Sequence, residues 1–421
     1  LTDCYAAAPN CSPARTGLMT GRTPYRVGVY NWIPFLSPIH VRESEVTVAT
    51  LLQDAGYDTC HVGKWHLNGW FNLPGQPQPG DHGFSHWFST QNNALPNHRN
   101  PYNFVRNGIP VGPLEGYASH LVTDEAIAWL KEGRNQEKPF FLYCCYHEPH
   151  EPIATDPNFA DLYDGHPSRK AHHGNISQMD AAFGRLMGAL DHLNLRENTI
   201  VLFTSDNGPA LTNRHPWGST GPLRMHKGHL YEGGIRVPGI VRWPGVTKPG
   251  SESNTPACGV DVLPTCCELA GVDVPADRTL DGTSLVPLFQ GKALERDKPL
   301  YWQFNYARSW PKVCIRDGDW KLLANLDPDD QGNLTDITDE QIEQLKTAKL
   351  AEFELYNLRE DIGEENNRVE SDPEVLTRLR KKLESLYVEV QEEGPRWPNW
   401  DWPRYEGKRI IWPDYPIPKN E

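Results

Sequence analysis

Three segments with strand character, two of them apolar and one short and mixed, each run directly into a cluster of polar residues, and this arrangement constrains the fold more than any other feature. Stretches with helical periodicity separate these segments. Such alternation predicts an α/β domain with a largely parallel sheet. Because ligands bind outside the carboxyl ends of parallel strands, the polar clusters are expected to share one site. The strands are expected at residues 57–62, 140–146 and 199–204, and the clusters at residues 63–67, 147–152 and 205–208.

Periodicity and glycine or proline content predict the regions between these strands. A helix is expected at residues 44–55, closed by Gly56. The segment 140–146 is continuously apolar, which is typical of a strand buried on both faces. Residues 68–115 are rich in glycine, proline, asparagine and aromatics and are expected to form a long irregular excursion. Further helices are expected at residues 119–132 and 171–192, the second with Ile176, Met179, Phe183, Leu186 and Leu190 on one side.

The pattern changes near residue 299 to short strands, which predict a small antiparallel sheet with a helix packed on it. Asp317-Gly318 is a strong hairpin signal. We therefore expect a larger, site-bearing domain at residues 1–295 and a C-terminal subdomain at residues 296–421. The Trp-rich tail from Pro395 is expected to pack in an extended form over the surface, with sugar stacking as the alternative. The strands are expected at residues 300–304, 313–316, 320–323 and 353–358, and the helix at residues 372–392.

Composition excludes several classes of protein. The chain has 421 residues, of which 38% are hydrophobic, and no apolar run is long enough to span a membrane. A formal charge of -14 argues against nucleic acid as a partner, so an anionic substrate would need a local cluster of cations. The nine cysteines are odd in number and lack zinc-binding spacing, so they do not reveal the compartment. Leu1 is not a natural start, and an N-terminal piece is expected to be missing.

Cys11, Pro13 and Arg15 stand at alternate positions just before an apolar pair of residues. Proline fits the first turn of a helix, so Cys11 is expected just before a helix and Arg15 about one turn further on. The positive end of the helix dipole lowers a thiol pKa and binds anions. The alternative is a buried structural cysteine.

Cys11–Arg15, followed by Thr20-Gly21-Arg22, carries a family signature. The pattern Cys-x-Pro-x-Arg resembles that of the type I sulfatases of the alkaline phosphatase superfamily, whose cysteine is oxidised after translation to formylglycine by a dedicated maturation enzyme. The resemblance implies an alkaline-phosphatase-like fold, with a mixed, mostly parallel sheet between helices.

Four further blocks follow in the family's order. Gly63–Leu67 matches its Gly-Lys-Trp-His-Leu block, Pro149–Pro152 its Pro-His-x-Pro block, and Thr204–Pro209 its metal block. Lys227 precedes a complete Tyr-Glu-Gly-Gly-x-Arg-x-Pro run, which spans residues 231–238 and in which Arg236 is expected to be a structural ion-pair partner. Taken separately, Lys64 and His66 could be a surface lysine beside a hydrogen-bonded histidine. Asp206-Asn207-Gly208 could be a turn, and the glycine pair a loop that enters a strand.

The resemblance assigns roles to individual residues. Lys64, His150 and Lys227 would contact the substrate sulfate, with Arg15 sharing the charge. His66 would contact the formylglycine, whereas His147 is expected to support the site from behind. The metal, Ca²⁺ or alternatively Mg²⁺, would be bound by Asp206 and Asn207, whose oxygens suit hard cations. Weaker candidates for substrate binding are Asn92, Asn93 and His98 in the irregular excursion.

The implied reaction is hydrolysis of a sulfate ester, with a carbohydrate as the expected substrate. One hydroxyl of the hydrated formylglycine would attack sulfur, and deprotonation of the other, by His66, would expel sulfate as the aldehyde re-forms. His150 and Lys227 would assist the leaving group. The alternatives are phosphonate or phosphodiester hydrolysis on the same fold, and a non-catalytic glycan-binding protein.

One departure from the family pattern concerns the metal. The family carries two further aspartates on a first strand, and Asp3 lies too close to Cys11 to replace them. The first strand and half the metal ligands are therefore expected to be missing, which puts activity of the chain in doubt. A periplasmic or secreted location is expected from the resemblance alone.

Overall fold

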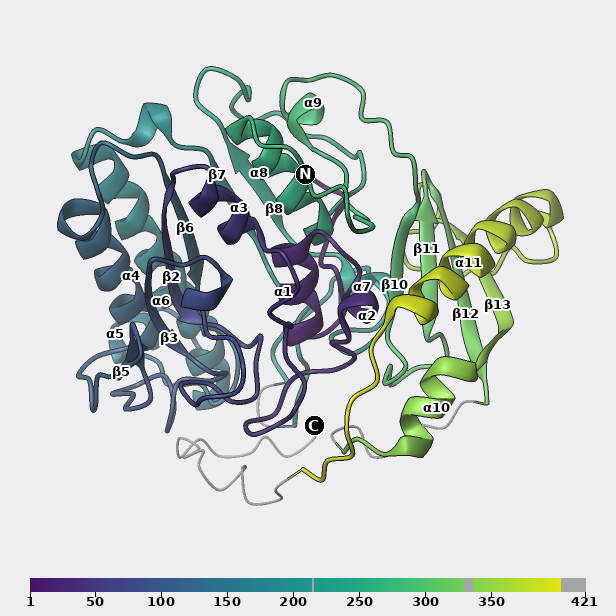
Figure 1. The fold of residues 1–421 in the computed structure, drawn as a ribbon, viewed down its shortest axis with the longest axis horizontal. Helices are drawn as coiled ribbons and strands as arrows, with labels where there is room; N and C mark the ends of the chain where they lie inside the picture. Colours follow the sequence, from purple (N-terminus) through teal and green to yellow (C-terminus); the bar gives the residue numbers. More distant parts are fainter. Residues whose placement is uncertain (214–215, 329–335, 403–421) are drawn as a thin grey trace. The chain divides into compact units, whose positions relative to one another are not determined.

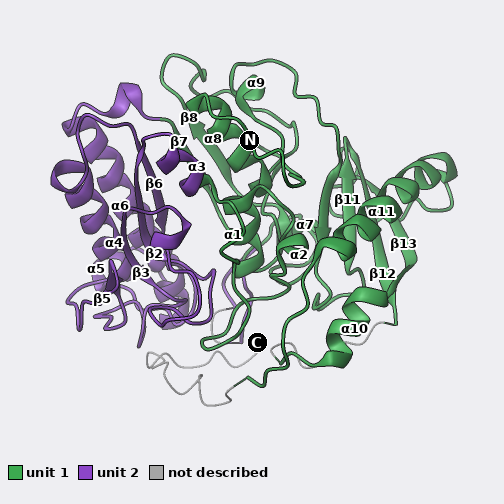
Figure 2. Cartoon of the chain, viewed as in Figure 1, with its two compact units in different colours: residues 1–48, 200–209, 220–402 green, residues 49–199, 210–219, 403–421 purple. Residues whose placement is uncertain are grey.

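The computed structural model describes residues 1–213, 216–328 and 336–402. The chain forms two compact units (Figure 2). Unit 1 contains Leu1–Val48, Ile200–Pro209 and Thr220–Trp402, and unit 2 contains Ala49–Thr199 and Ala210–Ser219. This division does not follow the boundary expected at residue 295, because unit 1 contains residues on both sides of it. The expected division into two domains stays a prediction.

Unit 2 is built on a five-stranded sheet with the order β5-β4-β3-β2-β6 (Figure 1). Its interior strand β2 runs parallel to β3 on one side and to β6 on the other. The predicted parallel arrangement is therefore confirmed for these three strands. The strands are β2 (Asp58–Lys64), β3 (His86–Thr90), β4 (Val105–Arg106), β5 (Ile109–Pro110) and β6 (Phe140–Cys145).

The prediction that residues 68–115 form only an irregular excursion is wrong. Strand β3 lies within them and pairs with β2 over five consecutive residues, and β4 and β5 extend the sheet beyond it. The sequence His86–Thr90 has a polar residue at each end and lies among turn-forming residues, so its strand character depends on β2 rather than on a local pattern.

Strand β6 was predicted correctly in position but wrongly in burial. Of its six residues only Cys145 is buried, and the other five are half-exposed. Within the part of the chain that the structure describes, β6 pairs only with β2 and lies at the edge of the sheet. A continuous apolar run therefore did not suffice to place this strand in the interior.

The helices of unit 2 pack on this sheet and on one another. Helix α4 contacts β2, β6 and α6, and α5 packs against α6. The buried side of α6 is lined mainly by small and polar residues, whereas Ile176, expected on that side, is 38% exposed. Gly174 allows this close packing, because a Cβ there would lie 2.7 Å from the backbone of Ala160. The helices are α3 (Val48–Asp54, which begins in unit 1), α4 (Ala118–Ala128, continued by a π-turn at Trp129–Gly133), α5 (Pro157–Ala160) and α6 (Pro167–His192).

Unit 1 contains two small sheets beside the helix that begins at the signature cysteine. The strand expected at residues 199–204 is present as β7, but among the described residues it pairs antiparallel with β8 and does not join the sheet of β2 and β6. Strand β1 is parallel to β9. Helix α1 packs against α2, η4 and α8. These elements are β1 (Cys4–Tyr5), α1 (Cys11–Thr20), α2 (Pro24–Val27), β7 (Val201–Thr204), α7 (Glu232–Ile235), β8 (Gly239–Arg242), β9 (Ala257–Cys258), η4 (Gly259–Asp261), α8 (Val262–Ala270) and α9 (Val286–Phe289).

The predicted C-terminal sheet is confirmed as part of unit 1. Its four antiparallel strands follow one another in order, and Gly318, with φ of 64°, forms the hairpin turn between β11 and β12. Helix α11 packs on β11 and β12. The elements are β10 (Leu300–Gln303), β11 (Val313–Asp317), β12 (Trp320–Asp327), α10 (Asp339–Thr347), β13 (Lys349–Asn357) and α11 (Pro373–Glu393).

The described part of the tail packs back on unit 1. The indole Nε1 of Trp397 donates to the Gly28 carbonyl at 2.7 Å, and Trp400 pairs with Ile337. This fits the expected extended packing, whereas the rest of the Trp-rich tail lies outside the described residues. Among the described helices, none combines the length and apolar character needed to cross a bilayer.

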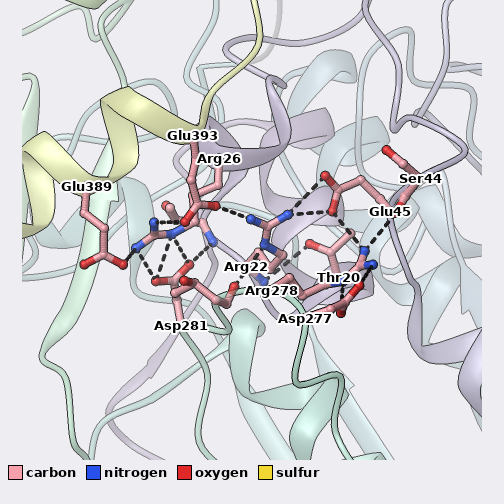
Figure 3. Close-up of polar contacts among 12 residues, drawn as sticks. Thr20, Arg22, Arg26, Ser44, Glu45, Asp277, Arg278, Asp281, Glu389 and Glu393 are labelled. Carbon is pink, nitrogen blue, oxygen red and sulfur yellow. Dashed lines mark hydrogen bonds and ion pairs between the residues drawn. The ribbon is translucent and has the colours of Figure 1, made fainter.

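A network of ion pairs holds α1 and α2 against α11 (Figure 3). Arg26 on α2 is fully buried and reaches the carboxylates of Asp281 at 3.0 Å and of Glu389 and Glu393 at 2.8 Å. Arg22, which follows α1, contacts Glu45 at 2.8 Å and also Glu393. Because Arg26 satisfies three carboxylates, its removal would leave several charges without a counter-ion.

We expect Arg26→Met to lower the free energy of unfolding by about 3 kcal/mol, since it breaks a buried network from one side. The matched control is Arg380→Met, whose pair with Glu384 is half-exposed at 2.7 Å and should contribute less than about 0.5 kcal/mol. Chemical denaturation of both variants measures the difference, and equal losses would contradict a structural role for the network.

Candidate active site

Helix α1 begins at Cys11 itself. The side chain of Asn10 caps the helix by accepting a hydrogen bond from the Cys11 amide at 2.9 Å, and Cys11 is only 3% exposed. The expectation that Cys11 precedes the helix is therefore wrong by one position. It was based on Pro13, which does lie in the first turn, whereas the N-cap signal of Asn10 was missed. The cysteine lies at the positive end of the helix dipole.

A second loop supports the helix start and was not found from the sequence. The side-chain amide nitrogen of Asn10 donates to the side-chain oxygen of Asn31 at 3.0 Å. The amide of Ile33 donates to the Ser12 hydroxyl at 3.0 Å. These contacts fix the residues on either side of Cys11, and nothing in the local sequence pairs the two segments.

Arg15, one turn into α1, forms an ion pair with Asp206. Its Nε and Nη2 atoms lie 3.0 and 2.9 Å from Asp206 Oδ2. The neighbouring Asn207 donates through its amide nitrogen to the Gly208 carbonyl at 2.8 Å, and its buried Oδ1 has no hydrogen-bond partner among the described residues. The structure thus brings Arg15 and Asp206 together, with Asn207 next to Asp206 in the chain, and the roles expected of these residues stay predictions.

The side-chain oxygens of Asp206 and Asn207 have the chemistry of ligands for a divalent cation. A carboxylate and an amide oxygen are hard ligands, and the buried Asn207 Oδ1 would gain a partner from a cation. Within residues 1–213, 216–328 and 336–402, no group of three or more His, Cys, Asp or Glu is placed to bind one ion. Binding of a cation by Asp206 and Asn207 therefore stays a prediction.

Lys227 points at Cys11, as its Nζ donates to Cys11 Sγ at 3.3 Å. The backbone of the lysine is tied to both neighbouring loops, because the Lys227 amide donates to the Pro209 carbonyl and the Gly228 amide to the Pro9 carbonyl, each at 3.0 Å. The sequence placed Lys227 in the site by resemblance alone. The structure brings it to within hydrogen-bond distance of the thiol.

The glycine pair Gly233-Gly234, which follows Lys227, allows the segment after β7 and the segment that carries Lys227 to pack closely. A Cβ at Gly233 would lie 2.0 Å from the Met225 carbonyl oxygen, and one at Gly208 would lie 2.0 Å from the Gly233 carbonyl oxygen. The Gly208 amide also donates to the Gly234 carbonyl at 2.9 Å. The close backbone approach predicted for the pair is confirmed.

Arg236 forms the expected ion pairs. It contacts Glu232 at 2.7 Å and also Asp3. Arg316 binds the other oxygen of Asp3 at 2.5 Å. Asp3 therefore forms ion pairs with two arginines, Arg236 and Arg316.

Lys64 and His66 lie at the end of β2 in unit 2, and they are 2% and 1% exposed. The amide of Trp65 donates to the Thr90 carbonyl at 3.0 Å and that of His66 to the Gln91 carbonyl at 2.7 Å. His66 has φ of 59°, a left-handed conformation that costs free energy in a residue other than glycine. Lys64 and His66 therefore do not lie on one extended segment.

His147 and His150 follow β6. The Nε2 of His147 lies 2.8 Å from the Thr90 hydroxyl, and His147 is 3% exposed. The Nδ1 of His150 lies 2.5 Å from the Glu151 carbonyl. A carbonyl can only accept, so Nδ1 of His150 carries the hydrogen and Nε2 is the nitrogen that could exchange a proton with a substrate.

The three weaker candidates lie in different surroundings. Asn92 and Asn93 are half-buried, and their carbonyls accept hydrogen bonds from Thr90 at 2.8 Å and Asn103 at 2.9 Å. His98 is fully buried, and this burial lowers the pKa of its imidazole. Substrate contact by these residues stays a prediction.

The fold and the site match one family. The family model described as Sulfatase matches residues 1–272, and a second, described as N-sulphoglucosamine sulphohydrolase, C-terminal, matches residues 224–349. The chain therefore belongs to the sulfatase family, whose members generally use a formylglycine and a divalent metal.

Among individual relatives, human arylsulfatase A is 31% identical over 427 residues, covering 92% of this chain and 80% of that protein. N-acetylgalactosamine-6-sulfatase of Sus scrofa is 34% identical over 322 residues, covering 69% of this chain and 59% of the relative. The chain thus spans about three fifths of the N-acetylgalactosamine-6-sulfatases that it matches.

The crystal structure of Ps i-CgsB in complex with k-i-k-neocarrahexaose is 26% identical, with a TM-score of 0.79, and the match covers 94% of this chain and 86% of that one. The alkaline-phosphatase-like fold predicted from the sequence is confirmed.

We expect Gly233→Ala to displace the loop that carries Lys227, because the new Cβ would meet the Met225 carbonyl. Since a shift of about 1 Å at a reacting group can cost about 10²-fold, kcat/KM for an aryl sulfate ester should fall by about that factor. Gly188→Ala is the control. No neighbouring atom lies within 4 Å of the place that a Cβ would take at this helical position, so activity should be unchanged and stability higher by about 0.5–1 kcal/mol. Unaltered kcat/KM in Gly233→Ala would contradict the close packing.

Proposed function

We propose that this protein hydrolyses sulfate esters of carbohydrates, with Cys11 converted to formylglycine as the reactive residue. The observation that carries the proposal is the 3.3 Å contact between Lys227 Nζ and Cys11 Sγ at the start of α1. It places a cation at the residue that the family signature marks for modification. The formylglycine, once hydrated, supplies a nucleophilic hydroxyl and a route by which sulfate can leave.

The residues of unit 1 stabilise negative charge on the sulfate oxygens. Lys227 supplies an ammonium group, and the first amides of α1 supply the positive end of its dipole. Arg15 is held in place by Asp206 at 2.9 Å, so its guanidinium needs little reorganisation when charge develops. Burial of Cys11 and Arg15, which are 3% and 7% exposed, strengthens these interactions by excluding water.

Asp206 and Asn207 would bind the divalent cation, for which we propose Ca²⁺, with Mg²⁺ as the alternative. Such a cation supplies Lewis-acid stabilisation of charge on sulfuryl oxygens. The ion pair with Arg15 orients the Asp206 carboxylate, and the buried Asn207 Oδ1 has no competing hydrogen bond among the described residues.

Three residues of unit 2 enter the proposal through the family resemblance. Lys64 binds sulfate, His66 acts as the base that deprotonates the second hydroxyl, and His150 assists the leaving group. The position of the hydrogen on His150 Nδ1, which faces the Glu151 carbonyl at 2.5 Å, supports proton exchange through Nε2. Asn92, Asn93 and His98 remain candidates for contacts with the sugar.

The carbohydrate part of the proposal is supported by relatives named for N-acetylgalactosamine 6-sulfate and by the neocarrahexaose complex of Ps i-CgsB. A formylglycine-generating enzyme is the expected maturation partner, and a periplasmic or secreted location is carried from the family resemblance. The sulfated position and the sugar are left open.

Turnover of 4-nitrophenyl sulfate and of bis(4-nitrophenyl) phosphate by the matured protein tests the reaction class. We expect a preference for the sulfate ester, with Cys11→Ala inactive and Lys227→Ala lower in kcat by about 10²–10³-fold. Arg380→Met, far along the chain on the exposed side of α11, is the control and should retain full activity. A clear preference for the phosphodiester would favour the second reaction class and contradict the proposal.

Peptide mass spectrometry across Cys11 tests the modification independently of turnover. Formylglycine replaces the thiol and a hydrogen by a carbonyl oxygen, so the peptide should be lighter than its cysteine form. A plain thiol after co-expression with the maturation enzyme would instead support a non-catalytic glycan-binding protein.

A further inference from the structure

Glu364 holds both ends of the loop that carries Lys227. We define this lysine loop as residues 224–232. At its beginning, Arg224 Nη1 donates to the Glu364 backbone carbonyl at 2.8 Å. At its end, the Glu232 backbone amide donates to Glu364 Oε2 at 2.7 Å. One residue, 132 positions beyond Glu232 in the sequence, thus closes the loop through its main chain and its side chain.

The ends of the loop are also bound to each other. The guanidinium of Arg224 lies over the Tyr231 ring, 3.9 Å from its centroid. Arg224 Nη1 also donates to the Tyr356 hydroxyl at 3.0 Å. The stem of the loop is therefore a compact unit seated against β13 and the segment that follows it.

The carboxylate of Glu364 is fixed from its other side by Lys321 on β12. Lys321 Nζ lies 2.8 Å from Glu364 Oε1 and 2.9 Å from Glu232 Oε1, and all three side chains are fully buried. Burial, opposed by the charge of Lys321, raises the pKa of Glu364. For Glu232 burial also acts to raise the pKa, but the charges of Lys321 and Arg236 outweigh it and lower the pKa. Such a cluster has no freedom to shift without leaving a buried charge unpaired.

Between these fixed ends, Lys227 reaches the reactive cysteine. Its backbone is held by Pro209 and that of Gly228 by Pro9, each at 3.0 Å, while its Nζ lies 3.3 Å from Cys11 Sγ. A long, flexible lysine side chain can be directed only if its backbone is held in place. The C-terminal sheet therefore contributes to the site without supplying a group that touches it.

We propose that Glu364 is a positioning residue for Lys227, acting through the lysine loop. This rests on the proposed function, in which Lys227 binds the sulfate group. Displacement of the loop stem by about 1 Å would move Nζ away from the sulfate and cost about 10–100-fold in kcat/KM. Neither Glu364 nor Lys321 needs to contact the substrate for this effect.

A double-mutant cycle of Glu364→Gln with Lys227→Ala tests the proposal. Glutamine keeps the shape and one acceptor oxygen but removes the charge that pairs with Lys321, so a lower Tm is expected and the fold of each variant is checked by circular dichroism. If Glu364 acts through Lys227, Glu364→Gln should lower kcat/KM about tenfold or more in the natural chain and by less than about threefold when Lys227 is already alanine. Equal losses in both backgrounds would mean a general structural role and would overturn the proposal.

Leu379→Ala is the control for loss of stability. Leu379 lies on α11 with 0% exposure and contributes only to packing, so its removal should lower Tm. Its effect on kcat/KM should be the same factor in both backgrounds. Glu364→Asp, which keeps the charge with a shorter reach, should recover part of the activity lost in Glu364→Gln. No recovery would count against the carboxylate as the positioning group.

Binding of inorganic sulfate, measured by calorimetry, gives a second cycle that needs no turnover. Failure of the matured protein to hydrolyse sulfate esters would refute the proposed function, yet non-additive loss of sulfate binding would still support positioning of Lys227. If Lys227→Ala alters neither turnover nor sulfate binding, the positioning proposal is overturned, because the loop would then have nothing to position.

Discussion

The arrangement of unit 1 depends on the contacts made by the buried carboxylate of Glu232. It accepts from the Tyr5 hydroxyl on β1 at 2.7 Å and pairs with Arg236 at 2.7 Å and with Lys321 on β12 at 2.9 Å. A single carboxylate thus joins the N-terminal strand, the segment after Lys227 and the C-terminal sheet. Because an ionised carboxylate is costly to bury, each partner is required, and the three elements can adopt few other arrangements.

The electrostatics of the site are local. The chain carries a formal charge of -14, yet the start of α1 gathers Arg15, Lys227 and a helix dipole around Cys11. Close range and burial make these few cations effective where the overall charge would repel an anion.

Backbone packing, more than side-chain contact, sets the spacing of the loops. Gly63 would place a Cβ 1.9 Å from the Cys145 carbonyl oxygen, and Gly208 and Gly233 meet similar limits at 2.0 Å. Within each unit, the candidate polar side chains therefore lie next to positions where two backbone segments are in close contact. In this chain, Gly63 stands next to Lys64 and Gly208 next to Asn207, so the close backbone approach and the candidate side chains occur at neighbouring positions.

The sequence by itself determined the features that depend on local pattern. Alternating apolar runs and helical periods predicted the strands β2, β6 and β7, the hairpin at Gly318 and the parallel pairing of β2 with β6. The motifs singled out Cys11, Arg15, Asp206 and Lys227 as candidates, and the structure shows the contacts Arg15–Asp206 and Lys227–Cys11. The tertiary structure alone decided that His86–Thr90 is a strand, that β6 lies half-exposed at a sheet edge, and that Glu364 closes the lysine loop. Periodicity reports which face of an element can be buried, but not which distant segment covers it. Pairing between residues more than a hundred positions apart is fixed only when the whole chain is packed.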